Sequence, residues 1–179
     1  MDVAQRIYRL VKGSPRDRYQ KNGMIVGKRV FIDGRCVIDS EFYWLISIGD
    51  DVYLTSGTVI LAHDSSTVMF LGYTRIGKVV IGNRVFIGAN SVILPGVTIG
   101  DDVVIGAGSI VSMNIPSGSV AKGVPARVTG TINEFLARKR EEMQTSPRFE
   151  NEYTIYGNVN LARKSEMNEK LKGRYGYAP

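Results

Sequence analysis

A six-residue period runs through the middle of the chain and limits its fold more than any other feature. From position 81 the sequence divides into the blocks IGNRVF, IGANSV, ILPGVT, IGDDVV, IGAGSI and VSMNIP. An aliphatic residue opens every block, and a second small or aliphatic residue follows four positions later. This period is neither the 3.6 of an α-helix nor the two of a half-buried strand. It is the signature of a parallel β-helix, in which each block contributes one short strand and one turn.

The opening residues are expected to point inward and to stack on their counterparts in neighbouring turns. They are Ile81, Ile87, Ile93, Ile99, Ile105 and Val111, and the same frame extends back through Ile60, Leu54, Ile48, Phe42, Cys36 and Val30. Glycine follows the opening residue at positions 82, 88, 100 and 106, where a missing Cβ lets the backbone bend tightly. The Cys36 thiol is therefore expected to pack inside the coil, as free cysteines commonly do.

The frame breaks between Ile60 and Ile81, because these residues lie 21 positions apart and 21 is not a multiple of six. A loop over about residues 64–75 must leave the coil at this point. Insertions into repeat proteins gather on one face, which is often the binding face. His63, the single histidine of the sequence, stands where the chain leaves the repeat.

The chain is expected to be all-β with helical appendages, in three parts. Residues 1–29 form a basic arm with eight Lys and Arg against two Asp, and residues 2–12 have the apolar stripe of a short helix. The rest of this arm is assigned no regular structure. Residues 30–128 form the coil. Residues 129–179 hold a helix that starts after Thr131 and runs to about Met143, expected to cover the end of the coil, then a polar tail with a weaker helical pattern over residues 161–172.

Composition narrows the class of protein further. The 179 residues are 44% hydrophobic and 22% charged, which suits one domain with an ordinary core. No apolar run approaches the roughly 20 residues that cross a membrane. The single cysteine rules out an intrachain disulfide and favours a reducing compartment, so we expect a cytoplasmic protein. The net charge of +6 resides in the N-terminal arm, which favours an anionic ligand or lipid surface; nucleic acid is disfavoured because no aromatic residues interleave with the basic ones.

The repeat, the histidine at the loop exit and the closing sequence GVPARV resemble those of the hexapeptide-repeat acyltransferases, over about residues 30–130. This family includes maltose, galactoside, serine and xenobiotic acetyltransferases and many polysaccharide O-acetyltransferases. The resemblance implies a left-handed, three-sided parallel β-helix. It also implies a homotrimer with each active site between two subunits, acetyl-CoA as the co-substrate and no metal.

The resemblance assigns His63 as the general base of acyl transfer. A neutral imidazole suits this role, because its pKa lies near the working pH and it can take a hydroxyl proton as the oxygen attacks. The family positions for coenzyme A match small residues along the coil and basic residues at its end, namely Ala89, Ala107, Ser112, Lys122 and Arg127. The backbone N–H of Ala89 is also implied to stabilise the oxyanion. Many relatives have Trp in place of Phe86 and Lys in place of Met113.

The acceptor site is expected in the sequence DSEFYW, before the first clear repeat. Asp39, Glu41 and Trp44 combine carboxylates with an aromatic ring, which suits a sugar surface. The alternative interpretation is that Phe42 and Trp44 pack the first turn. Asp64 has three possible roles: it orients His63, it contacts the acceptor, or it caps the loop.

We therefore expect an acetyl-CoA-dependent O-acetyltransferase that acts on a sugar or a cell-surface polysaccharide precursor. Two alternatives stay open: an N-acetyltransferase acting on a nucleotide-linked amino sugar, and a non-catalytic scaffold subunit. A γ-class carbonic anhydrase is excluded, because its zinc needs three His ligands and the chain has one His and one Cys. The basic N-terminal arm adds the hypothesis of peripheral contact with anionic lipid.

Overall fold

The computed structural model describes residues 15–179, so the helix expected over residues 2–12 and its lipid contact lie outside the described residues. The described residues form two compact units, which divide between Ile132 and Asn133. The first unit contains the repeat and every residue expected to take part in catalysis or binding. The second contains the polar tail.

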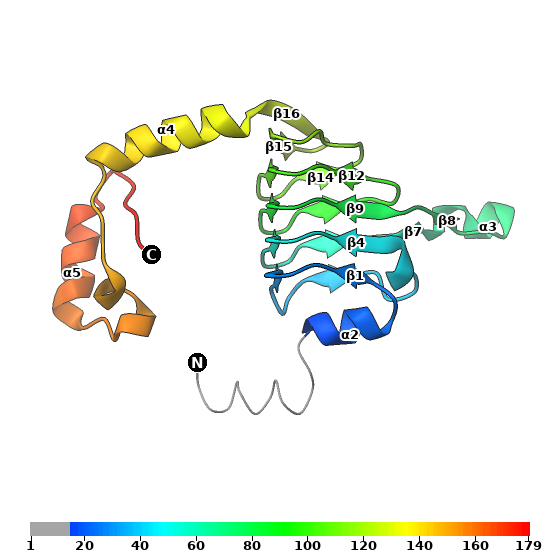
Figure 1. Cartoon of the computed structure of the whole chain (residues 1–179), viewed down its shortest axis with the longest axis horizontal. Helices are drawn as coiled ribbons and strands as arrows, with labels where there is room; N and C mark the ends of the chain where they lie inside the picture. The colour runs from blue at the N-terminus through cyan, green and yellow to red at the C-terminus, as the bar shows by residue number, and fades with distance from the viewer. Residues whose placement is uncertain (1–14) are drawn as a thin grey trace. The chain divides into compact units, whose positions relative to one another are not determined.

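Short parallel strands in the first unit form three sheets around a common core (Figure 1). Sheet A contains β1 (Ile25–Val26), β4 (Ile46–Ile48), β9 (Val79–Ile81) and β12 (Thr98–Ile99). Sheet B contains β2 (Phe31–Ile32), β5 (Tyr53–Leu54), β10 (Phe86–Ile87), β13 (Val104–Ile105) and β15 (Ser119–Gly123), with β16 (Ala126–Thr131) at its edge. Sheet C contains β3 (Val37–Ile38), β6 (Val59–Ile60), β11 (Val92–Ile93) and β14 (Ile110–Val111). Because strands visit the three sheets in rotation, the chain winds as a three-sided coil.

Inward side chains stack from turn to turn, as the six-residue period predicts. In sheet B the strand register aligns Ile32, Leu54, Ile87, Ile105 and Ala121. The residue four positions after each opening residue is buried as well. These residues are Val85, Ser91, Val97, Val103, Ser109 and Ile115. Each fully buried aliphatic side chain stabilises the fold by about 1.5–3 kcal/mol relative to exposure. The stacked columns therefore form the core of the unit.

The frame assigned to the first turn is wrong by four residues. The register pairs Val26 with Ile48, Ile32 with Leu54 and Ile38 with Ile60, so these residues open the first turn instead of Val30, Cys36 and Phe42. A four-residue insertion after β3, containing the short helix η1 (Tyr43–Leu45), causes the error. Val30 and Cys36 occupy the fourth position after an opening residue and pack against the core from there. The expected packing of Cys36 is confirmed.

Both ends of the coil are covered. At the start, α2 (Pro15–Lys21) precedes β1, and Tyr19 and Met24 join the hydrophobic core. The segment to which no regular structure was assigned thus holds a helix and the first strand of the coil, and Pro15 is the first residue of that helix, where its fixed φ is suitable. At the other end, β16 pairs antiparallel with β15 and covers the edge of sheet B.

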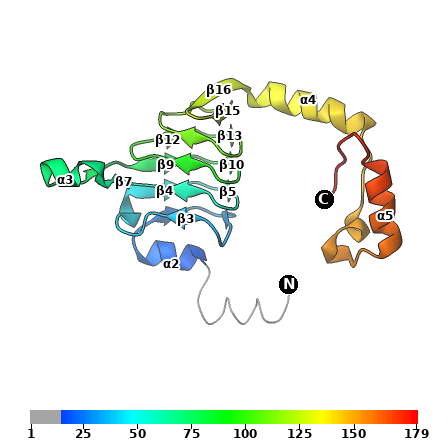
Figure 2. The same cartoon turned by 180° about the vertical axis from the view of Figure 1, so that it is seen from behind.

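A hairpin arm projects from the coil where the loop over residues 64–75 was expected (Figures 1 and 2). It consists of β7 (His63–Asp64), η2 (Ser65–Thr67), α3 (Val68–Leu71) and β8 (Arg75–Ile76). Antiparallel pairing of His63 with Ile76 and of Asp64 with Arg75 joins its two sides. Gly72 ends α3 with a φ of 73°, a left-handed conformation that favours glycine. We call residues 63–76 the arm.

The second unit is helical. It contains α4 (Ile132–Thr145), η3 (Asn151–Tyr153), η4 (Ile155–Gly157) and α5 (Leu161–Lys170), which confirms both helices expected in this part. Phe149 is buried against Tyr153, and the Tyr153 hydroxyl donates to Glu166 Oε2 at 2.7 Å. Within residues 15–179, no helix has the length and apolar character needed to cross a membrane.

Candidate active site

Two insertions into the repeat lie at the same corner of the coil, between sheets C and A. The first follows β3 and the second, which is the arm, follows β6. Because β3 and β6 pair in parallel register, the residues that follow them also lie side by side. The Asp39 N–H donates to the Ile60 carbonyl at 2.9 Å. Strand pairing therefore brings Asp39 and His63 together across 24 residues of sequence.

The carboxylate of Asp39 is buried and accepts hydrogen bonds on both oxygens. Its Oδ2 lies 2.8 Å from the Ala62 N–H and 2.5 Å from His63 Nδ1, and its Oδ1 accepts from the N–H groups of Glu41 and Phe42 at 3.0 and 3.1 Å. Burial alone would raise the pKa of this carboxyl. The donors from Ala62, Glu41, His63 and Phe42 outweigh burial and lower the pKa below its usual value. Asp39 is therefore a fixed anion.

His63 is held by this anion in one orientation. Its side chain is 22% exposed, whereas that of Asp39 is 0% exposed. Since a carboxylate only accepts, Nδ1 carries the hydrogen, and a neutral ring has its free lone pair on Nε2. The Phe42 ring lies 5.5 Å from the imidazole, centroid to centroid. The pair thus presents an oriented base, which is what proton abstraction from a hydroxyl requires.

A cleft of about 550 Å³ opens beside His63. Its lining residues come from the arm and from the same corner of the later turns: Leu61, His63, Asp64, Ser65, Arg75, Leu94, Pro95 and Ser112. Ser112, expected to contact coenzyme A, therefore lies at the same cleft as His63. Arg75 was not predicted from the sequence to lie at the site. It lines the cleft because β8 pairs with β7, which places Arg75 opposite Asp64. Over residues 15–179, no group of three or more His, Cys, Asp or Glu side chains is placed to hold a metal ion.

The expected acceptor residues divide into buried and exposed ones. Asp39 has no accessible side-chain surface, so the expectation that it contacts the acceptor does not fit its burial. Asp64 accepts from the Ser66 N–H at 2.9 Å and caps η2, which agrees with the third of its possible roles. Glu41 is exposed, and Trp44 is 61% exposed with its ring 5.6 Å from that of Phe42. Glu41 and Trp44 remain available to a ligand.

The other expected coenzyme residues lie elsewhere on the coil. Ala89 and Ala107 follow β10 and β13 at the corner between sheets B and C, where the Gly108 N–H donates to the Ala89 carbonyl at 2.8 Å. Lys122 and Arg127 are paired in the β15–β16 hairpin, and Arg127 Nη1 lies 3.5 Å from the Met113 sulfur. One chain therefore does not bring Ala89 and Ala107 together with His63.

Comparisons with known proteins agree with this architecture. The sequence model of the family described as bacterial transferase hexapeptide (six repeats) matches residues 78–112. Protein CapG of Staphylococcus aureus is 39% identical over 165 residues, which cover 89% of this chain and 91% of that protein. Galactoside O-acetyltransferase of Escherichia coli K12 is 43% identical over 110 residues, or 54% of each chain. A hexapeptide-repeat acetyltransferase of Vibrio cholerae O1 biovar eltor, solved with acetyl coenzyme A, has a TM-score of 0.55 and 28% identity, covering 62% of this chain and 61% of that chain.

Proposed function

Because this chain belongs to the hexapeptide-repeat acetyltransferases, we propose that it transfers an acetyl group from acetyl-CoA to a hydroxyl group of a sugar or a cell-surface polysaccharide precursor. The observation that carries the proposal is the Asp39–His63 pair beside an open cleft. The sugar acceptor is supported by the likeness to galactoside O-acetyltransferase. Exposed Trp44 and Glu41 in the neighbouring insertion offer a ring face and a hydrogen-bond acceptor to a sugar.

In the proposed mechanism His63 acts first as base and then as acid. Its Nε2 removes the proton of the acceptor hydroxyl while that oxygen attacks the acetyl carbonyl carbon. Asp39 holds the ring in the required tautomer and stabilises the imidazolium that forms. The Ala89 N–H donates to the oxyanion, where fixed donors lower the barrier most. His63 then returns the proton to the sulfur of coenzyme A as the carbon–sulfur bond breaks.

We place this reaction between subunits of a homotrimer of left-handed coils. Sheet C lies between the corner that holds His63 and the corner that holds Ala89 and Ala107. Its outward-facing residues are all aliphatic: Val37, Val59, Val92 and Ile110. A three-fold axis in front of sheet C would bury this face and bring His63 of one subunit beside Ala89 of the next. Each groove would then contain both halves of the site.

In this arrangement the coenzyme is bound mainly by backbone and basic groups. Ala89 and Ala107 have side chains small enough to let a pantetheine arm approach the backbone, and Ser112, at the cleft of the subunit that carries His63, would face the same groove. Lys122 and Arg127 supply positive charge to the phosphates. With Met113 in place of the lysine found in many relatives, phosphate binding rests on Arg127 and the basic N-terminal arm, with Lys122 as a neighbouring candidate.

Titration calorimetry with acetyl-CoA tests the proposal without knowledge of the acceptor. We expect one site per subunit in the wild-type protein and in His63→Ala, because His63 acts in chemistry and not in donor binding. Turnover with saccharide acceptors should fall by about 10²- to 10⁴-fold in His63→Ala, the usual contribution of a positioned general base. Asp64→Asn serves as the neighbouring control and should retain most of the activity, because asparagine keeps the cap of η2.

Two outcomes contradict the proposal. A wild-type protein that binds no acetyl-CoA would instead be a scaffold subunit or use another donor. Undiminished turnover in His63→Ala would remove the histidine from the chemistry. An acceptor panel that contains matched hydroxyl and amino sugars separates O-acetylation from N-acetylation.

A further inference from the structure

The cleft beside His63 contains a cation that the proposed reaction does not use. Arg75 lies on β8, opposite Asp64 on β7, and it lines the cleft together with His63. Among the described residues, no other lysine or arginine lines this cleft. The proposed function gives roles to His63 and Ser112, but it leaves Arg75 without one.

Arg75 differs from other arginines of the coil in having no carboxylate partner. Three of those arginines form ion pairs with aspartates, which are the pairs Arg29–Asp51, Arg35–Asp33 and Arg84–Asp102. Within residues 15–179, Arg75 forms no ion pair. The Asp64 carboxylate lies at the same cleft, but it accepts from the Ser66 N–H at 2.9 Å instead of pairing with Arg75. The guanidinium of Arg75 is therefore available to a ligand.

The chemistry of a guanidinium indicates what this ligand carries. Its N–H donors form a planar fork that matches two oxygens of a carboxylate or a phosphate, and its charge is permanent. The cleft also has the hydroxyl groups of Ser65 and Ser112 and an apolar lining, which suit the hydroxyls and the ring face of a sugar. The apolar lining consists of Leu61, Leu94 and Pro95. A sugar with an anionic group matches every part of this surface.

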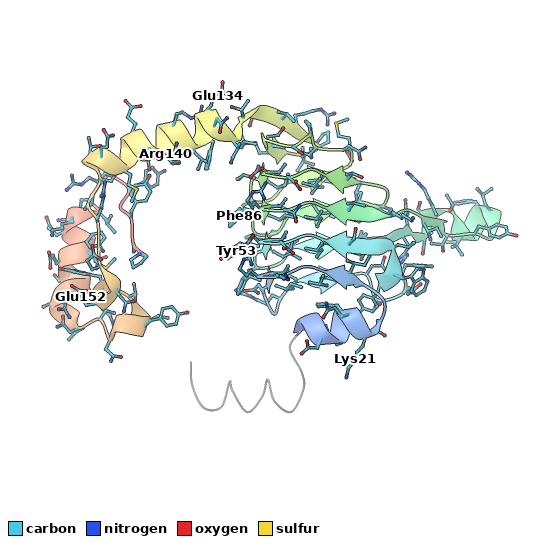
Figure 3. The ribbon with its side chains drawn as sticks, viewed as in Figure 1. Lys21, Tyr53, Phe86, Glu134, Arg140 and Glu152 are labelled. Carbon is cyan, nitrogen blue, oxygen red and sulfur yellow. The ribbon has the colours of Figure 1, made fainter. Side chains whose placement is uncertain are left out.

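Arg75 borders the reacting centre, whereas the phosphates of coenzyme A must lie away from it. The thioester has to meet the acceptor hydroxyl beside His63, and the pantetheine arm separates the thioester from the phosphates. The cations proposed for those phosphates, Lys122 and Arg127, lie in the β15–β16 hairpin. The arm and its cleft also lie across the coil from Tyr53 and Phe86 of sheet B (Figure 3). Arg75 therefore belongs with the acceptor.

We propose that Arg75 selects an acceptor sugar that carries an anionic group, either a carboxylate or a phosphate. This inference rests on the proposed function, because it takes the cleft beside His63 as the acceptor site. The anionic group binds the guanidinium fork and holds the sugar so that a hydroxyl meets His63 Nε2. Arg75 is thus a specificity-determining residue, and no proton passes through it.

Titration calorimetry with matched sugars tests this selection. The panel contains methyl glycosides of glucose, galactose and mannose, the corresponding methyl uronides, and the corresponding sugar 1-phosphates. At least one anionic sugar should bind the wild-type protein about 10- to 100-fold more tightly than its neutral counterpart, the effect expected of one charge-assisted contact. The uronide and phosphate arms distinguish the two sources of the anion. Binding of no anionic sugar, or equal binding of anionic and neutral sugars, overturns the proposal.

Substitutions of Arg75 show whether the preference arises from its fork. Arg75→Gln should remove the preference, and Arg75→Lys should keep only part of it, because lysine keeps the charge without the planar fork. Lys78→Gln is the matched control, since Lys78 is exposed three residues later and does not line the cleft. A preference that survives in Arg75→Gln, or that falls equally in Lys78→Gln, contradicts a direct contact.

The single histidine of the chain locates the bound sugar. The ring C2 proton of His63 gives one magnetic resonance signal, which should shift when the preferred anionic sugar is added to the wild-type protein. The same addition should leave the signal unchanged in Arg75→Gln. An unshifted signal in a wild-type protein that binds the sugar would place the binding away from the cleft and overturn the proposal.

Acetyl-CoA binding separates failure of this inference from failure of the proposed function. Wild type and Arg75→Gln should bind acetyl-CoA equally. Weaker binding in Arg75→Gln would assign the arginine to the donor and overturn the selection, while the enzyme itself would still be supported. Absence of acetyl-CoA binding in the wild-type protein would instead remove the proposed function, whatever the sugar titrations show.

Discussion

Two regions of the coil differ in the side chains that they bury. One is the set of regular turns, and the other is the corner between sheets C and A that carries both insertions, which we call the inserted corner. From Ile81 to Val111 every sixth residue is an aliphatic side chain that is almost fully buried. At the corner between sheets C and A the repeat is interrupted twice, and the carboxylate of Asp39 is buried there. A buried charge is tolerated only where it is hydrogen-bonded, and both oxygens of Asp39 are.

The regular turns therefore supply most of the packing that stabilises the coil, whereas the inserted corner holds the side chains of the candidate site. The regular turns bury apolar columns and hold neighbouring strands in register. The inserted corner uses that register to place residues that are distant in sequence, so its geometry depends on the turns below and above it. Substitutions in the two regions should therefore change different quantities, and the following predictions are arranged from the largest expected effect.

Ile105→Ala should lower the free energy of unfolding by about 2–5 kcal/mol, because it leaves a cavity in a closely packed column. Ile105 is 0% exposed and stacks between Ile87 and Ala121. Its neighbour Val104 faces outward on the same strand and is partly exposed. Denaturant unfolding should show a much smaller loss for Val104→Ala. Similar losses for the two variants would contradict the inward and outward assignment of the period.

The regular turns were largely predictable from sequence, whereas the first turn was not. A strict period fixes which residues point inward, and a gap of 21 residues exposed the arm. The four-residue insertion before β4 left no such trace, because Val30 and Cys36 are also apolar and also face the core. Each block has two inward positions, the opening residue and the residue four positions later. A shift of four residues moves the second position onto the first, and the apolar pattern alone cannot distinguish the two.

Asp39→Asn should reduce turnover by about 10²-fold, part of the about 10²–10⁴ that a positioned general base contributes. An amide has one acceptor oxygen, so either the His63 side or the Glu41 side of the group would lose its acceptor. Acetyl-CoA binding should remain, because Asp39 is buried away from ligands. Asp64→Asn is the matched control, since asparagine caps helices nearly as well as aspartate. A loss of acetyl-CoA binding in Asp39→Asn would contradict a role in orienting His63.

The same substitution should change the pH dependence of stability. The pKa of Asp39 is lowered in the folded chain, so its contribution is full above the unfolded value of about 3.9 and is lost as the pH falls through the folded value. The difference in unfolding free energy between wild type and Asp39→Asn should therefore narrow below about pH 4. A difference that stays constant from pH 7 to pH 3 would show that the carboxylate charge does not stabilise the fold.

The hydrogen-bond partner of His63 could not be assigned from sequence for a related reason. Asp64 is adjacent to the histidine in the chain, whereas Asp39 lies 24 residues before it. Only the pairing of β3 with β6 brings Asp39 to the histidine, and the wrong frame for the first turn concealed that pairing. The position of the histidine beside the arm was predictable, because it stands at the interruption of the repeat; its role as a base stays a prediction.

Gly88→Ala and Gly34→Ala test the smallest expected effect, which is the loss of stability when a Cβ is added at the corner between sheets B and C. A Cβ on Gly88 would lie 2.4 Å from the Ala107 nitrogen and 2.7 Å from its Cα, and neither backbone atom can move without shifting the next turn. A Cβ on Gly34 would have no neighbour within 4 Å. We expect Gly88→Ala to cost about 1–3 kcal/mol by overpacking, and Gly34→Ala to change stability by less than about 1 kcal/mol. Thermal unfolding of both variants measures how rigidly the turns are stacked. A stability loss at Gly88 no larger than at Gly34 would contradict the close stacking of the regular turns, on which the geometry of the inserted corner depends.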